Sequence, residues 1–179
     1  MKNTLVTVVK GTDDVLTAVR GAVKNQIVGT LKDVGDVATA SLDTVADVTK
    51  GAVSATGEVG GSLTELIEGT VTGAVNGVSE VGGNVILAAR KATRGVVAGV
   101  AETGGDVGSA AVDAVEASMN AAGKLGVSTT DAVRESVVGA VKAADEVGDE
   151  AGKSVRDALL SAAALPRDVV EAAIKGSSK

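Results

Sequence analysis

The chain has 179 residues, of which 45% are hydrophobic, and its formal net charge is −6 at pH 7. It contains no Phe, Trp, Tyr, His or Cys, so it lacks the aromatic groups of an ordinary core, the commonest proton shuttle, thiol nucleophiles and soft metal ligands. We therefore expect a non-enzyme with no catalytic residue, cofactor, metal site or small-molecule substrate, and the acidic balance argues against binding to nucleic acid.

Residues 1–13 are predicted to form an N-terminal tip. The apolar stretch at residues 5–9 is too short for a signal peptide, and no apolar run approaches the ~20 residues of a membrane span. A cytoplasmic location is therefore expected. Asp13 and Asp14 suggest the start of the first helix, because carboxylates are favourable at the positive end of a helix dipole.

The region 14–165 is dominated by a repeat of eleven residues. One position in it, the apolar column, is never charged: Val23, Val34, Val45, Thr56, Ile67, Val78, Ala89, Val100, Ala111, Ala122, Val133, Ala144 and Val155. Two residues further on, the charged column is almost all charged: Asn25, Asp36, Asp47, Glu58, Gly69, Glu80, Lys91, Glu102, Asp113, Lys124, Glu135, Glu146 and Asp157. Eleven residues make about three turns of helix, so each column stays on one side of it.

The repeat predicts an all-α fold of long amphipathic helices that pack side by side in a bundle or a helical assembly. Its 24 glycines weaken an isolated helix, so another helix of the chain, another copy or a lipid surface must cover the apolar side. The predicted self-association face consists of Val23, Val34, Val37, Val45, Val48, Val59, Leu63, Ile67, Val71, Val78, Val81, Val85, Val96, Val100, Val107 and Val133.

A second period of 22 residues lies inside the first. Its small residues are Gly29, Gly51, Gly73, Gly95, Ala117 and Gly139. Pairs of adjacent glycines recur with the same period at residues 60–61, 82–83 and 104–105. Alanines and glycines such as Ala55, Ala88 and Gly99 add to this flank of small residues. The glycines indicate either close approach of a neighbouring backbone or hinges. An unbroken helix over residues 14–165 would span roughly 225 Å, whereas bends at the diglycines would give helices of about twenty residues.

The segment 166–179 is predicted to be a short C-terminal helix with a tail. Pro166 interrupts the helical pattern and suits the first turn of a new helix, and residues 176–179 are expected to fray.

Three charged or glycine-containing stretches resemble sites but are interpreted as plain helix surface. The basic cluster is Arg90, Lys91 and Arg94, and the acidic cluster is Asp145, Glu146, Asp149 and Glu150. The acidic cluster lacks the spacing of a calcium loop. The stretch at residues 152–154 lacks the earlier glycine and the preceding strand that a phosphate-binding loop requires.

At residues 50–53, 72–75 and 94–97 the chain reads Lys-Gly-Ala-Val, Thr-Gly-Ala-Val and Arg-Gly-Val-Val. With its eleven-residue pattern over about 14–165, it resembles the amphipathic helices of synucleins, apolipoproteins and perilipins. This resemblance implies helices that form on lipid or by self-association.

Two functions follow as expectations. The first is a structural homo-oligomer that self-associates through a helical face of Val, Ala and Gly, as a bundle, stalk or filament. The alternative is an amphipathic coat on a lipid surface, a droplet or a storage granule.

Overall fold

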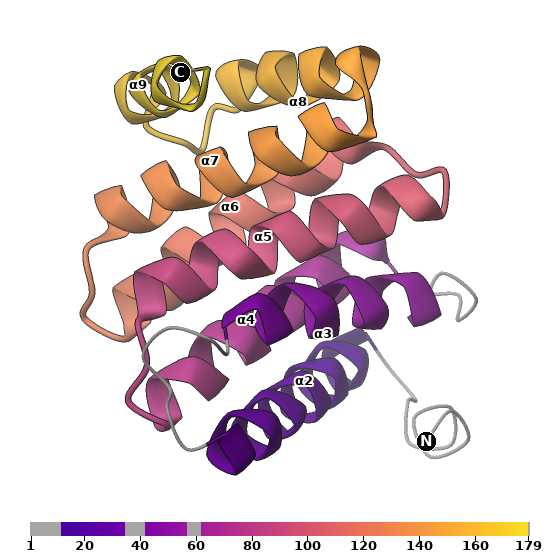
Figure 1. Ribbon diagram of the computed structural model, residues 1–179, viewed down its shortest axis with the longest axis vertical. Helices are drawn as coiled ribbons and strands as arrows, with labels where there is room; N and C mark the ends of the chain where they lie inside the picture. The colour runs from indigo at the N-terminus through magenta and orange to yellow at the C-terminus, as the bar shows by residue number, and fades with distance from the viewer. Residues whose placement is uncertain (1–11, 35–41, 57–61, 179) are drawn as a thin grey trace.

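The computed structural model describes residues 12–34, 42–56 and 62–178, and within these ranges it consists of α-helices joined by short turns, with no strand. Its helices are α2 (Thr12–Val34), α3 (Leu42–Thr56), α4 (Leu63–Glu80), α5 (Val85–Glu102), α6 (Val107–Lys124), α7 (Thr129–Val147), α8 (Asp149–Ser161) and α9 (Arg167–Ser177). The helices pack side by side (Figure 1), which confirms the predicted fold class. None of the described helices combines the length and apolar character that a membrane crossing needs.

The chain is bent at its glycines, so the unbroken helix is not formed. Gly82, Gly104 and Gly126 adopt φ values of +75°, +74° and +72°, a left-handed conformation that suits glycine. In the first of these turns the Gly83 N–H donates to the Val78 carbonyl at 2.9 Å, which closes the last turn of α4 as a Schellman motif. The same pattern of backbone hydrogen bonds recurs after α5 and α6.

A capping residue follows each of these turns and starts the next helix. In each case a side-chain oxygen accepts a hydrogen bond from the third backbone N–H of the next helix. The acceptor is the side-chain amide oxygen of Asn84 for α5, the carboxylate of Asp106 for α6 and the hydroxyl of Ser128 for α7. Turn and cap together explain the period of 22 residues, because α4, α5, α6 and α7 begin at residues 63, 85, 107 and 129.

The helices form two layers, and successive helices alternate between them. The helices α3, α5, α7 and α9 form one layer, while α2, α4, α6 and α8 form the other. Each helix from α4 to α7 contacts the two helices on either side of it in sequence. Figure 1 shows the stack from α2 and α3 at its lower end to α8 and α9 at its upper end.

The helices α3 and α5 run parallel within their layer. Asp43 and Lys50 follow one another along α3, and they pair with Lys91 and Glu102 in the same order along α5. This orientation follows from the short turns, because each turn reverses the direction of the chain and two turns restore it.

The apolar column forms the centre of the stack. Its members with described side chains are at most 4% exposed: Val23, Val45, Ile67, Val78, Ala89, Val100, Ala111, Ala122, Val133, Ala144 and Val155. Without aromatic residues, this core consists of valine, alanine, leucine and isoleucine packed between closely spaced helices. The helices therefore cover one another within a single chain.

Several predicted boundaries differ from the structure by a few residues. The first described helix begins at Thr12 rather than at Asp14. Gly148, with φ +155°, separates α7 from α8, and this break was not predicted. The helix before Pro166 ends at Ser161 rather than near Leu165, and α9 continues through Ser177, so the expected tail is partly helical.

Candidate self-association surface

The helical glycines mark places where two backbones come together. A Cβ atom built on Gly73 of α4 would lie 2.5 Å from the carbonyl oxygen of Arg20 in α2. Cβ atoms on Gly95 of α5 and Gly139 of α7 would likewise collide with the carbonyl oxygens of Ala46 in α3 and Arg90 in α5. The expectation of close approach is therefore confirmed at these positions, where each helix packs against the helix two before it.

Around these glycines, four positions per helix form a continuous face made mostly of small residues, here called the docking column. In α4 to α7 it consists of Leu66, Thr70, Gly73 and Gly77; Ala88, Ala92, Gly95 and Gly99; Ala110, Ala114, Ala117 and Ala121; and Ala132, Ser136, Gly139 and Ala143. Every one of these residues is buried. The docking column is thus fully covered in the four middle helices.

The same column is uncovered in α2 and α3. Its members there, here called the open face, are Ala22, Gln26, Gly29 and Asp33 of α2 and Thr44, Val48, Gly51 and Ala55 of α3. Thr44 and Val48 are half-buried and the other six are exposed. No described atom lies within 4 Å of a Cβ atom built on Gly29 or Gly51. Within the described residues, the first two helices therefore present the surface that later helices bury.

Residues of the charged column form ion pairs with the helix two before their own, which is also the helix that the glycines approach. These pairs are Glu80 with Lys24, Lys91 with Asp43, Glu102 with Lys50, Glu135 with Arg90 and Glu146 with Arg94, at 2.5–3.2 Å. The basic cluster at Arg90, Lys91 and Arg94 was predicted to be a plain solvated surface. This was incomplete, because each of its members pairs with a carboxylate on another helix.

These ion pairs act on the pKa values of their carboxylates. The hydrogen bond from Lys91 lowers the pKa of Asp43, and the hydrogen bond from Lys24 lowers that of Glu80. By contrast, Asp47, the charged-column residue of α3, is exposed and forms no ion pair with any other described residue. Beside the open face, Asp47 therefore occupies the charged-column position that forms an ion pair with an earlier helix in α4, α5 and α7.

The seam between α4 and α6 carries carboxylates on both sides. The Thr64 hydroxyl donates to the Asp113 carboxylate at 3.0 Å, while burial and the nearby charge of Glu68 raise the pKa of Asp113. Burial, and then the charge of Asp113, raise the pKa of Glu116. A hollow of about 510 Å³ lies between α4 and the end of α6, lined in part by Glu68 and Lys124.

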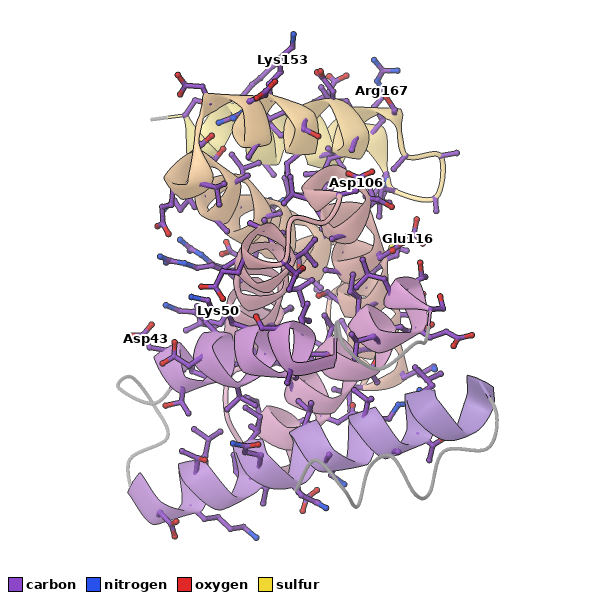
Figure 2. The ribbon with its side chains drawn as sticks, turned by 90° about the vertical axis from the view of Figure 1, so that its right-hand side faces the viewer. Asp43, Lys50, Asp106, Glu116, Lys153 and Arg167 are labelled. Carbon is purple, nitrogen blue, oxygen red and sulfur yellow. The ribbon has the colours of Figure 1, made fainter. Side chains whose placement is uncertain are left out.

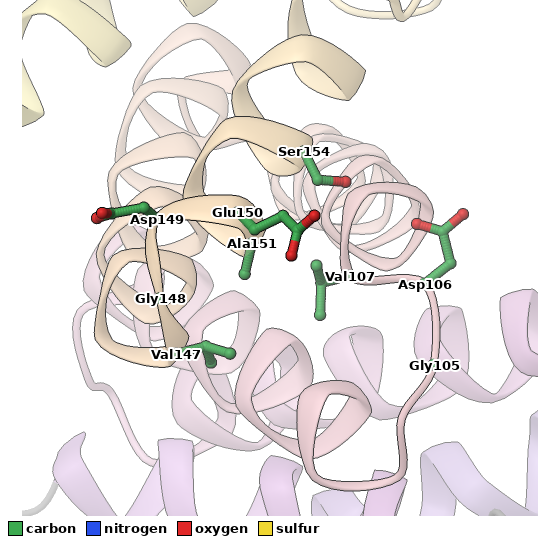
Figure 3. Close-up of a pocket in the computed structure, with 9 residues that line it drawn as sticks. All are labelled: Gly105, Asp106, Val107, Val147, Gly148, Asp149, Glu150, Ala151 and Ser154. Carbon is green, nitrogen blue, oxygen red and sulfur yellow. The ribbon is translucent and has the colours of Figure 1, made fainter.

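A second hollow, of about 460 Å³, lies where the start of α6 meets the start of α8. Figure 3 shows Glu150 and Ser154 turned toward it and Asp149 turned away. The described residues contain no group of three or more histidine, cysteine, aspartate or glutamate side chains that could hold a metal ion. The stretch 152–154 lies inside α8, as ordinary helix.

The acidic cluster is divided between different surroundings. Arg156 of α8 holds Asp145 through two hydrogen bonds of 2.7 and 2.8 Å, and Arg94 of α5 pairs with Glu146. Asp149 and Glu150 lie in the first turn of α8 and are exposed. The interpretation as solvated surface was therefore too simple for Asp145 and Glu146.

The predicted self-association face is mostly used inside the chain. Its buried members are Val23, Val45, Ile67, Val71, Val78, Val96, Val100 and Val133. Its half-buried members, packed against the core, are Val48, Val81, Val85 and Val107. Leu63, the first residue of α4, is 40% exposed. Val37, Val59 and the side chain of Val34 lie outside the described residues.

Sequence reasoning identified the small-residue flank but missed its division into covered and open parts. Gly29 and Gly51 occupy the same repeat position as Gly73 and Gly95, and only the tertiary arrangement separates them. No protein-family model and no curated protein matches this chain.

Proposed function

We propose that this protein is a non-enzymatic structural protein that self-associates by extending its two-layer stack beyond α2 and α3. The observation that carries the proposal is the open face, whose equivalents in α4 to α7 are all buried. Small side chains there would allow a further pair of helices to approach as closely as α5 approaches α3.

The contact that builds the stack is heterologous, because one side of a helix packs against the opposite side of the next-but-one helix. A heterologous contact does not close on itself unless a rotation brings the ends together, so repetition gives a ring or an open filament. The same logic makes repeat proteins depend on caps at their ends. Association through the open face would satisfy that need by using a second copy.

The alternative, a coat on a lipid surface, receives less support. The apolar column is buried between helices, and the large hydrophobic residues exposed among the described ones are Leu63, Leu125 and Val147, which belong to separate helix ends or turns. Binding to lipid through the apolar column would require the stack to open. We therefore favour a second copy as the partner.

The proposal is tested by sedimentation velocity over a concentration series, with Gly51→Gln as the blocking variant. Its side chain has room in the single chain but fills the open face, so association should weaken by about fivefold to a hundredfold, as overpacking of an interface costs roughly 1–3 kcal/mol. Gly21→Gln is the matched control, because Gly21 is also free of described neighbours within 4 Å yet lies outside the docking column.

The unmodified protein should gain mass with concentration, and the control should follow it. A folded protein that stays monomeric at every concentration would overturn the proposal. A parallel series with phospholipid vesicles, neutral and anionic, distinguishes the alternative: helix content and vesicle binding that rise together, without growth in protein alone, would favour the lipid coat.

A further inference from the structure

We propose that the open face is occupied by the outer side of α8 and α9 from a second copy, so that α3 packs on α9 and α2 on α8. This inference rests on the proposed function and names its partner surface. It predicts a polar head-to-tail assembly in which all copies point the same way.

The alternation of layers supports this pairing. After α9, which lies in the layer of α3, α5 and α7, the next helix of a continued stack belongs to the layer of α8. The helix α2 lies in that layer, and α3 follows in the layer of α9. A second copy placed beyond α9 therefore continues the order of layers.

The outer side of α9 also has the small residues that this contact needs. Val170 and Ala173 are buried toward the stack, while Ala172 and Gly176 are exposed on the other side. Ala172 is the sixth residue of α9, as Arg90 is the sixth residue of α5, and the Arg90 backbone meets Gly139 of α7. In this register the backbone at Ala172 would meet Gly51.

Charge favours this arrangement over a dimer in which two open faces pack against each other. Asp47 has no ion-pair partner among the described residues, whereas α9 exposes the basic residues Arg167 and Lys175. Among the residues that the structure describes, Arg167 pairs only with Glu171 on its own helix, and its side chain is 74% exposed, so it can change partners at little cost. Figure 2 shows Arg167 at the end of the molecule remote from Asp43 and Lys50 of α3.

Two open faces packed against each other would instead place Asp33 and Asp47 of one copy near the same carboxylates of the other. Like charges across an interface are unfavourable. The register of the stack supports a contact between Asp47 and Arg167, because Asp43, near the start of α3, pairs with Lys91 near the middle of α5. Arg167 begins α9, and Asp47 lies near the middle of α3.

Disulfide trapping tests the arrangement directly, because the chain has no cysteine of its own. Full-length Gly51→Cys and Ala172→Cys are purified separately, mixed at a concentration at which the unmodified protein associates, and oxidised mildly. The mixture should give a cross-linked dimer, and neither variant alone should do so. Thr130→Cys, at an exposed position of α7, replaces Ala172→Cys in the control mixture and should give no cross-link with Gly51→Cys.

Charge reversal provides a second measurement. Asp47→Arg and Arg167→Asp should each weaken association by about threefold to fivefold, as expected for a contact of roughly 1 kcal/mol at the rim of an interface. The double variant carries the reversed pair and should recover most of the loss. A merely additive loss in the double variant would contradict a direct contact between these two side chains.

The outcomes separate the inference from the proposed function. A protein that remains monomeric overturns both. Growth in mass together with cross-linking of Gly51→Cys to itself overturns only the head-to-tail inference and establishes a face-to-face dimer. Growth in mass without a cross-link between positions 51 and 172 also overturns the inference alone.

Discussion

Glycine has two separate roles in this chain, and both recur with the period of 22 residues. Gly104 has a φ of +74° and permits the turn between α5 and α6. Gly95, in the middle of α5, instead lies in ordinary helix where the backbone of α3 approaches. A helical glycine is costly in isolation, by about 1 kcal/mol relative to alanine. Here the close contact that it permits offsets that cost.

The second role predicts a large effect from one methyl group. In Gly95→Ala the new Cβ would collide with the Ala46 carbonyl oxygen and the Thr49 hydroxyl, so we expect the free energy of unfolding to fall by about 1–3 kcal/mol. In Gly21→Ala, where no described atom is near, it should rise by up to about 1 kcal/mol. Urea unfolding followed by far-ultraviolet circular dichroism measures both. Equal stabilisation by the two substitutions would contradict the close approach.

At the scale of elements, helices are joined by polar contacts as well as by the apolar core. The pair between Arg156 and Asp145 spans the break at Gly148 and fixes the angle between α7 and α8 through two parallel hydrogen bonds. Two-point contacts of this kind hold their geometry better than single ion pairs. The contact between α4 and α6 has no comparable ion pair among the described residues, and carboxylates face it from both helices.

Asp145, between α7 and α8, and Asp113, between α4 and α6, predict opposite dependences of the free energy of unfolding on pH. The Arg156 hydrogen bond lowers the pKa of Asp145 below its ordinary value of 3.8, so its stabilisation is present above that value and is lost as the pH falls through the folded-state pKa. Asp145→Asn should therefore destabilise the protein near neutral pH and have little effect in strong acid.

Asp113→Asn is the matched comparison. Burial raises the pKa of Asp113, so its ionised form destabilises the folded state above the folded-state pKa, and the asparagine can still accept the hydrogen bond from Thr64. This variant should be more stable than the parent near neutral pH and equal to it below the unfolded pKa. Unfolding curves at several pH values measure both differences, and differences of the same sign would refute this assignment of causes.

The elements were largely predictable, but their ends were less so. The eleven-residue period indicated helices, and Gly82-Gly83 and Gly104-Gly105 indicated where they could bend. The turn at Gly126 was missed because Val127 replaces the second glycine, although the left-handed residue that the turn requires is still present. The break at Gly148 was missed because the helical pattern of charges continues across it.

The open face could not be found from sequence for a physical reason. A column of small residues says that a backbone can come close, but not whether one does. Gly51 and Gly95 have the same repeat position and similar neighbours, and the difference between them arises only when successive helices sort into two layers. The apolar column was correct as a buried surface, while its role in association between chains stays a prediction.

On the scale of the whole molecule, the stack is close to one-dimensional, because each helix contacts only helices one or two places away, apart from weaker contacts. In such architectures stability is roughly a sum of the units and their neighbour contacts. Helices at an end with fewer neighbours should therefore open more readily than those in the middle.

Hydrogen exchange followed by mass spectrometry tests this expectation. In dilute protein the amides of α2 should exchange fastest among the long helices, and those of α5 and α6 slowest, since the latter are covered on both sides within their layers. At concentrations that favour association, protection should increase in α2 and α3 before it increases elsewhere. Uniform exchange along the chain would show that the stack unfolds as one cooperative unit instead.

The alternation of layers also constrains how a gene for such a protein can lengthen. Duplication of one unit of 22 residues would move every later helix into the opposite layer and reverse its direction, since α4 and α5 differ in both respects. Duplication of two units, from the start of α4 to the start of α6, would restore layer, direction and ion-pair register together. Tandem growth of the coding sequence should therefore proceed in steps of two helices.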